Sequence, residues 1–195
     1  LENIGCTGVA MGVESGNLKL RKSLLARMMP DEEIVNGFKE FEKTKIRISA
    51  NNIIGFPGES REDIMSTIEI NRQINPDSIV VNAFRPYSGT KLRKICIDKG
   101  LIPKEKRAED NRVYGAFYNG VLPADELENI RKVFALYVTF PKSRWKEIRK
   151  AEKDSVLFNK LMKEYSSKQL FNRKNREQII DAKEGFINDK EAIVI

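Results

Sequence analysis

Three apolar stretches alternate with amphipathic stretches over the first half of the chain. The apolar stretches cover residues 7–13, 46–54 and 78–84, and each has the length of one buried strand. The segments between them carry leucine, isoleucine and phenylalanine at the spacing of a helix that buries one face. Since right-handed crossovers join parallel strands, this order predicts three parallel βα units.

Local signals mark where the helices of these units begin. Pro30 precedes a run of acidic residues, which favour the positive end of a helix dipole. Ser60 and Asp63 have the spacing of a capping box. Thr90 can cap a helix that ends at Gly100. We therefore predict that a helix begins at each of these three points.

The predicted strands are too few to close a barrel and leave a bare sheet edge. We therefore predict an α/β fold in which residues 1–100 form part of a (β/α) barrel. For residues 101–195 the pattern predicts a helical C-terminal region rather than further βα units. Helical patterns there cover about 123–140, 141–152 and 154–166, and the charged tail from Asn172 is expected to be flexible or to form a last helix.

The first residue of the chain is Leu1 rather than methionine, one short step before the first predicted strand. A trimmed tag would explain this start, but so would a chain cut from the middle of a barrel. The bare edge of the predicted sheet favours the second explanation. We expect a fragment whose N-terminal half is missing.

Composition excludes several classes of protein. No apolar run approaches the roughly 20 residues that cross a bilayer, and the polar residues after Leu1 exclude a signal peptide there, so we expect no membrane contact. Cys6 and Cys96 are too few for a disulfide framework or a structural zinc site, which favours a reducing, cytoplasmic location. Histidine is absent, which removes serine–histidine and cysteine–histidine nucleophiles and histidine-ligated metals.

The net charge of +7, with a pI near 9.3, raises the question of nucleic-acid binding. Basic residues are mostly interleaved with acidic ones, as in residues 39–43, which is typical of solvated helix faces. Denser basic clusters occur at 144–153 and 168–176. This distribution favours a generic basic surface over a phosphate-binding track, and nucleic acid is not the expected partner.

The first predicted strand ends in Gly12–Gly16, with Glu14 and Ser15 at its centre. A carboxylate at a strand end can accept hydrogen bonds from an ammonium group or from ribose hydroxyls, and a serine can donate or accept. The same two residues are also a common signature of a helix start. Carboxyl ends of parallel strands meet on one rim, so the next two strand ends are expected beside this one.

The second predicted strand ends in two adjacent amides, Asn51 and Asn52. Side chains alternate along a strand, so one of them must point to the inner face of the sheet and the other away from it. A buried asparagine needs partners, which predicts that one of the two meets a polar ligand or a network. Gly55 and Gly58 allow the backbone of the following turn to approach a flat ring.

Polar and aromatic residues cluster after the third predicted strand as well. Asn82, Arg85 and Tyr87 lie close together in the sequence, and Arg85 or Tyr87 could hold an anionic or planar group. Arg27, which follows the first helical stretch, could reach a carboxylate or could simply be an exposed residue at a helix end. Three polar strand ends in series predict a binding face.

Together these segments resemble the second half of the core of radical S-adenosylmethionine (SAM) enzymes. That family has a G[IV]ESG segment with a basic residue about a dozen positions on, then a GxPGE[TS] turn, then P[YF]xGT, each after a successive strand. The matching residues here are Gly12–Gly16, Arg27, Gly55–Ser60 with Asp63, and Pro86–Thr90. Their order and spacing agree over about residues 5–100.

The resemblance implies a role for each matching strand end. Glu14 and Ser15 are expected to bind the ribose or amino group of SAM, and Arg27 its carboxylate. The remaining expected contacts, with adenine or methionine, are Asn51, Asn52, Ile54, Gly55, the backbone near Phe84, and Tyr87.

The chain departs from the family at one decisive point, because the CxxxCxxC motif that ligates a [4Fe–4S] cluster is absent. Cys6 and Cys96 cannot replace it. In the family the motif follows the first strand, so the cluster ligands are expected in the missing N-terminal half. The resemblance implies that the full-length parent cleaves SAM reductively to a radical that attacks an unknown substrate, and that this chain alone is inactive.

The region after the predicted sheet leaves alternatives open. Residues 101–166 resemble family members that carry a cobalamin-binding domain, which implies cobalamin as a further cofactor of the parent. An RNA-modifying methylthiotransferase shares the core motifs, but the small C-terminal β-barrel of that group contrasts with the helical pattern here. A non-catalytic basic module would instead bind RNA through residues 144–176, with steep salt dependence.

Overall fold

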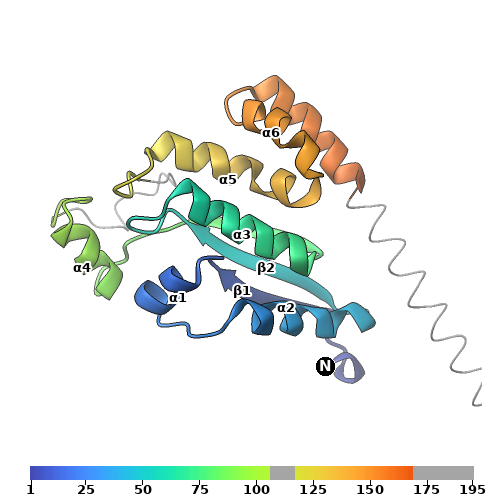
Figure 1. Ribbon diagram of the computed structural model, residues 1–195. Helices are drawn as coiled ribbons and strands as arrows, with labels where there is room; N and C mark the ends of the chain where they lie inside the picture. Colours follow the sequence, from blue (N-terminus) through green and yellow to red (C-terminus); the bar gives the residue numbers. More distant parts are fainter. Residues whose placement is uncertain (106–116, 169–195) are drawn as a thin grey trace, which may run out of the picture.

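The structure, a computed structural model, describes residues 1–105 and 117–168 (Figure 1). It has the predicted α/β fold, in which three parallel strands with their helices precede a helical C-terminal region. The tail from Asn172, expected to be flexible or to form a last helix, lies outside the described residues.

The elements follow the predicted order along the chain. The strands are β1 (Gly8–Glu14), β2 (Arg47–Ile54) and β3 (Ser78–Ala83). The helices are α1 (Leu18–Leu25), α2 (Asp31–Lys39), α3 (Arg61–Ile74), α4 (Lys91–Asp98), α5 (Ala124–Thr139) and α6 (Trp145–Ala151), and residues 155–168 are also helical. Three short 3-10 helices in the described residues are η1 (Glu2–Ile4), η2 (Glu40–Lys43) and η3 (Lys142–Arg144).

The predicted helix starts are confirmed. Ser60 and Asp63 form a reciprocal capping box at the start of α3. The side chain of Thr90 accepts a hydrogen bond from the backbone N–H of Arg93 and so caps α4. Pro30 is the N-cap residue of α2, whose first turn is acidic.

The three strands form one parallel sheet in the order β1-β2-β3. Gly12 lies opposite Asn51, and Asn51 lies opposite Val80. Because this register is parallel throughout, the carboxyl ends of all three strands meet on one rim, as the sequence predicted.

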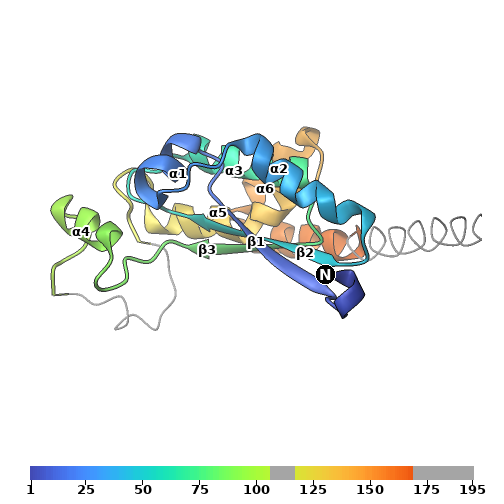
Figure 2. The same ribbon diagram turned by 90° about the horizontal axis from the view of Figure 1, so that it is seen from below.

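Among the described residues, helices cover only one face of the sheet. Buried side chains alternate along β2, where Ile48, Ala50, Asn52 and Ile54 face the helices. Figure 2 shows α1, α2, α3 and α5 together on that side of the strands. The opposite face, called the open face below, consists of Gly8, Ala10, Gly12, Arg47, Ser49, Asn51, Ile53, Ser78, Val80 and Asn82. In a barrel this face would be the interior.

The C-terminal helices pack onto the sheet through a shared hydrophobic cluster. Ile54 of β2 and Ile64 of α3 belong to the same buried group as Leu127 and Phe134 of α5 and Ile148 of α6. The end of α5 is held by Arg72 of α3, whose Nη1 donates to the carbonyls of Tyr137, Val138 and Phe140 at 2.7 Å each.

Within the described ranges, no helix is long and apolar enough to cross a bilayer.

Gly16 lets the loop after β1 touch the backbone of α3. A Cβ atom added at Gly16 would overlap the carbonyl group of Ser66. The Gly16 N–H donates to Oγ1 of Thr67 at 2.7 Å, which fixes this approach. The glycine is therefore required by close packing between loop and helix rather than by a turn alone.

Replacing Gly16 with alanine should strongly destabilise the chain, because the overlap is with helix backbone that cannot move aside. We expect a loss of about 3 kcal/mol in the free energy of unfolding, measured by urea denaturation. Gly8→Ala is the matched control, since a Cβ there would meet only the Arg47 carbonyl oxygen, at an ordinary 3.6 Å. Equal stability of the two variants would contradict this account of the loop.

Candidate functional site

The end of β1 folds a carboxylate back over a glycine. The pairing of β1 with β2 is irregular between Gly12 and Glu14, and Glu14 has a φ of 64°. A Cβ at Gly12 would overlap Oε1 of Glu14 and lie 3.0 Å from Nη1 of Arg27. The carboxylate of Glu14 therefore lies above Gly12 on the open face, and a side chain at residue 12 would displace it.

Arg27 reaches Glu14 because α1 ends in a left-handed turn. Ala26 has a φ of 52°, and the chain turns back so that Nη1 of Arg27 lies 3.2 Å from Oε1 of Glu14. The two side chains are one-third and one-quarter exposed, so the pair is open to a ligand. Burial raises the pKa of the Glu14 carboxyl, and the Arg27 guanidinium opposes that rise.

Ser15 fixes the loop that follows Glu14. Its side chain is fully buried, and its Oγ accepts a hydrogen bond from the backbone N–H of Asn17. Its carbonyl accepts from Nη1 of the buried Arg21 at 2.7 Å, and Arg21 also pairs with Asp31 of α2. The cap of α1 is Asn17 rather than Ser15.

The two asparagines of β2 face opposite sides of the sheet. Asn51 lies on the open face, in line with Gly12. Asn52 is fully buried on the covered face, where its amide exchanges two hydrogen bonds with Asn71 of α3, at 3.1 and 2.7 Å. Of the two, the structure thus brings the Asn51 side chain to the rim next to Glu14. Ile54 is also in the covered core.

A buried carboxylate shapes the turn after β2. Oε2 of Glu59 accepts hydrogen bonds from the backbone N–H groups of Gly55 and Phe56. Among the described residues its Oε1 has no partner. Burial raises the pKa of Glu59 to about 8, although the two N–H groups oppose that rise. Gly55 has a φ of +88°, which the tight turn requires.

Asn119, from the C-terminal region, clamps the same turn. Its side-chain amide donates to the carbonyls of Phe56 at 3.1 Å and Glu59 at 2.9 Å. Its own carbonyl accepts from the N–H of Gly58 at 2.8 Å, and its Oδ1 accepts from Leu122. Asn119 is fully buried. The sequence analysis missed this residue, because the turn that it clamps lies some 60 positions away along the chain.

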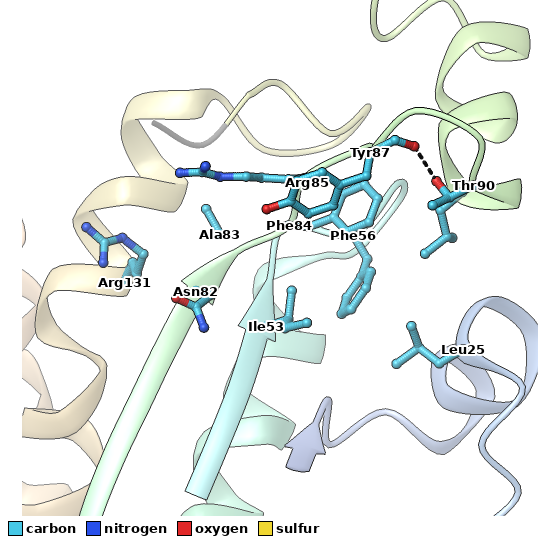
Figure 3. Close-up of a pocket in the computed structure, with 11 residues that line it drawn as sticks. Leu25, Ile53, Phe56, Asn82, Ala83, Phe84, Arg85, Tyr87, Thr90 and Arg131 are labelled. Atoms are coloured by element: carbon cyan, nitrogen blue, oxygen red, sulfur yellow. Dashed lines mark hydrogen bonds between the residues drawn. The ribbon is translucent and has the colours of Figure 1, made fainter. Parts of the chain in front are cut away.

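A pocket opens at the carboxyl ends of β2 and β3, with a volume of about 670 Å³ (Figure 3). Phe84 is buried and packs against Phe56 with the rings tilted, their centroids 5.1 Å apart. Tyr87 is half exposed and also lines the pocket. The lining residues are Leu25, Ile53, Phe56, Asn82, Ala83, Phe84, Arg85, Tyr87, Thr90, Leu92 and Arg131. Arg131, on α5, is a further residue that the sequence analysis missed.

The described residues do not fit an iron–sulfur cluster. No group of three histidine, cysteine or acidic side chains that could hold a metal ion occurs among them. Cys96 is fully buried beside Phe56 and Phe84, and Cys6 lies beyond the opposite, amino-terminal end of β1. A SAM molecule fits better, because a partly exposed carboxylate–guanidinium pair and a turn with positive φ meet on one rim.

Comparisons with known proteins give partial matches, and no family model matches the chain. It is 34% identical over 97 residues to a tRNA-2-methylthio-N(6)-dimethylallyladenosine synthase of Buchnera aphidicola, covering 49% of the chain and 22% of the relative. A probable threonylcarbamoyladenosine tRNA methylthiotransferase of Methanocaldococcus jannaschii is 31% identical over 85 residues, covering 43% and 20%. An uncharacterised methyltransferase of Pyrococcus horikoshii is 29% identical over 98 residues, covering 50% and 21%.

The chain thus spans about a fifth of the length of the curated relatives it matches. The matches support a relationship to radical SAM enzymes of the methylthiotransferase kind. They give no support to cobalamin as a cofactor. The expectation that nucleic acid is not a partner is also unsupported, because the names of two of these relatives specify tRNA.

Replacing Asn119 with alanine should loosen the turn at residues 55–59. The Glu59 carbonyl and the N–H groups of Val121 and Leu122 would lose the partner that Asn119 supplies, and the Phe56 carbonyl would keep only the Glu59 N–H. We therefore expect the free energy of unfolding to fall by about 3 kcal/mol. Asn159→Ala is the control, since Asn159 is an exposed residue of the C-terminal helical region, and its change should stay within about 0.5 kcal/mol. An equally small change for Asn119→Ala, measured by urea denaturation, would show that the clamp is dispensable.

The buried carboxyl of Glu59 should make stability depend on pH. Its pKa is higher in the folded chain than in the unfolded chain, so folding favours the protonated form. That contribution is complete below about pH 4.5 and is lost as the pH rises through about 8. The stability of the wild-type chain relative to Glu59→Gln should therefore decline over this range. Glu62→Gln, at an exposed position of α3, is the control, and a pH-independent difference for Glu59→Gln would refute the assignment.

Proposed function

We propose that the full-length protein containing this chain is a radical SAM enzyme, and that the chain supplies residues that bind SAM. The observation that carries the proposal is the Glu14–Arg27 pair, which lies over Gly12 on the open face. The strand-end motifs around it follow the order of the radical SAM core. The partial similarity to methylthiotransferases supports the same conclusion.

The rim offers separate groups for the polar parts of SAM. Glu14 accepts hydrogen bonds from the amino group or the ribose hydroxyls, and Arg27 binds the carboxylate. Asn51 lies beside this pair on the open face, and the turn at Gly55 presents backbone groups to the adenine or methionine portion. The backbone near Phe84 and the ring of Tyr87 complete the contacts from the pocket side.

Three of the expected site residues position the site in this proposal and do not contact SAM with their side chains. The side chains of Ser15, Asn52 and Ile54 are buried away from the open face. Asn52 and Ile54 anchor the end of β2 to the covered core, and Ser15 anchors the loop after β1. Their contribution is to hold Glu14, Asn51 and Gly55 in place.

The cluster ligands lie outside this chain in our proposal, since its cysteines do not fit them. When bound, a [4Fe–4S] cluster supplies the electron that cleaves SAM. The chain's own residues bind SAM, orient it through the Glu14–Arg27 pair, and form part of the wall that keeps water out. On its own the chain should be inactive.

A second, narrower candidate is a methylthiotransferase that acts on tRNA. The printed names of the Buchnera and Methanocaldococcus relatives favour it. The helical architecture of the described C-terminal residues differs from the β-barrel expected for that group. This candidate shares the SAM site with the broader proposal and differs from it only in the substrate.

Substituting either member of the ion pair should weaken SAM binding in the full-length protein. We expect Glu14→Gln and Arg27→Gln each to raise the dissociation constant of SAM about tenfold or more, because each removes a charge-assisted hydrogen bond. Lys94→Gln is the control, since it breaks an exposed ion pair with Asp98 on α4. The measurement is isothermal titration calorimetry with SAM, and unchanged constants for both rim variants would sink the proposal.

A further inference from the structure

Glu14 lies at the centre of a strained three-residue turn. The backbone N–H of Ser15 donates to the carbonyl of Val13 at 2.9 Å, and Glu14 between them has a φ of 64°. Turns of this kind with a positive φ are rare and cost energy at a residue that has a side chain, so surrounding contacts must hold them in place. The position of the Glu14 carboxylate therefore depends on what fixes the loop after β1.

Two hydrogen bonds join that loop to the first two turns of α3. The N–H of Gly16 donates to Oγ1 of Thr67, and Nδ2 of Asn17 donates to Oδ1 of Asp63. The carboxylate of Asp63 is itself fixed, because its Oδ2 accepts from the N–H of Ser60 in the capping box of α3. Asp63 therefore uses one oxygen for its own helix and the other for the loop after β1.

Along the chain, Asn17 lies between the two members of the Glu14–Arg27 pair. Its backbone N–H donates to Oγ of Ser15, the residue after Glu14, at 3.2 Å. Its Oδ1 accepts from the N–H of Leu20 at 3.0 Å and so caps α1, the helix that ends in the left-handed turn before Arg27. Its Nδ2 is the group that reaches α3. One amide side chain thus connects the segments that carry both members of the ion pair to α3.

We propose that Asn17 and Asp63 are positioning residues for SAM, which set the geometry of the Glu14–Arg27 pair. A hydrogen bond from an amide to a carboxylate is charge-assisted, and this one is partly buried, so it fixes both partners closely. A pair of groups held in place before binding takes up a ligand more tightly than a pair that must be ordered by it. The inference rests on the proposed function, because it requires that Glu14 and Arg27 bind SAM.

Exchanging the two side chains in the full-length protein tests the link. Asn17→Asp places two carboxylates against each other but keeps a good N-cap residue. Asn17→Asp/Asp63→Asn reverses donor and acceptor, because the carboxylate at position 17 can cap α1 while the amide at position 63 donates to it and accepts from Ser60. This double variant keeps the net charge of the wild type. Asn36→Asp, at an exposed position of α2, is the control for the added charge of Asn17→Asp.

We expect Asn17→Asp to raise the dissociation constant of SAM about tenfold, measured by isothermal titration calorimetry, and the double variant to restore it to within about twofold of the wild type. Asn17→Ser keeps a capping side chain but has no amide to donate, so it should raise the constant about fivefold. This milder variant decides the question if Asn17→Asp does not fold. Asn36→Asp should leave the constant unchanged.

The outcomes separate this inference from the proposed function. If the wild-type protein does not bind SAM, the proposed function fails and the inference fails with it. If the wild type binds SAM and Asn17→Ser binds it equally well, only the inference is overturned, even where urea denaturation shows a loss of stability, since the link would then be structural alone. Failure of the exchange to restore SAM affinity would overturn the inference in the same way.

Discussion

A parallel sheet of three strands must bury one face against helices, and the alternation of side chains along each strand then decides which residues stay uncovered. Here α2, α3 and α5 pack against the face that carries Ile48, Ala50, Asn52 and Ile54. Gly12, Asn51 and Asn82 therefore lie on the open face. Every group of the proposed site is on that open face or on the rim above it. A one-residue slip in β2 would turn Ile48, Ala50 and Ile54 to the open face and Asn51 into the covered core.

The rim itself is held by contacts from distant parts of the chain. Glu14 adopts a left-handed backbone conformation, which costs energy for a residue with a side chain and is common at functional sites. Its loop is fixed by Arg21 and by the approach of Gly16 to α3. The turn after β2 is fixed by Glu59 and by Asn119 from the C-terminal region. The helical region therefore positions the site as well as covering the core.

The order of strands and the helix caps could be predicted because each depends on neighbouring residues, as Ser60 and Asp63 show. The sequence also required Asn51 and Asn52 to face opposite ways, but choosing between them needed the partner Asn71 on α3. Arg27 could be matched by its spacing, although its approach to Glu14 depends on the left-handed turn at Ala26. Asn119 and Arg131 could not be predicted, because they reach the rim only through tertiary packing.

The most direct test of the central claim is formation of 5′-deoxyadenosine by the full-length protein, reconstituted anaerobically with iron and sulfide. The account predicts a product that requires both SAM and a reductant, and that falls sharply when Glu14 or Arg27 is replaced, because the pair orients SAM on the open face. A protein that takes up its cluster and binds SAM, yet forms the product equally well without this pair, would contradict the account.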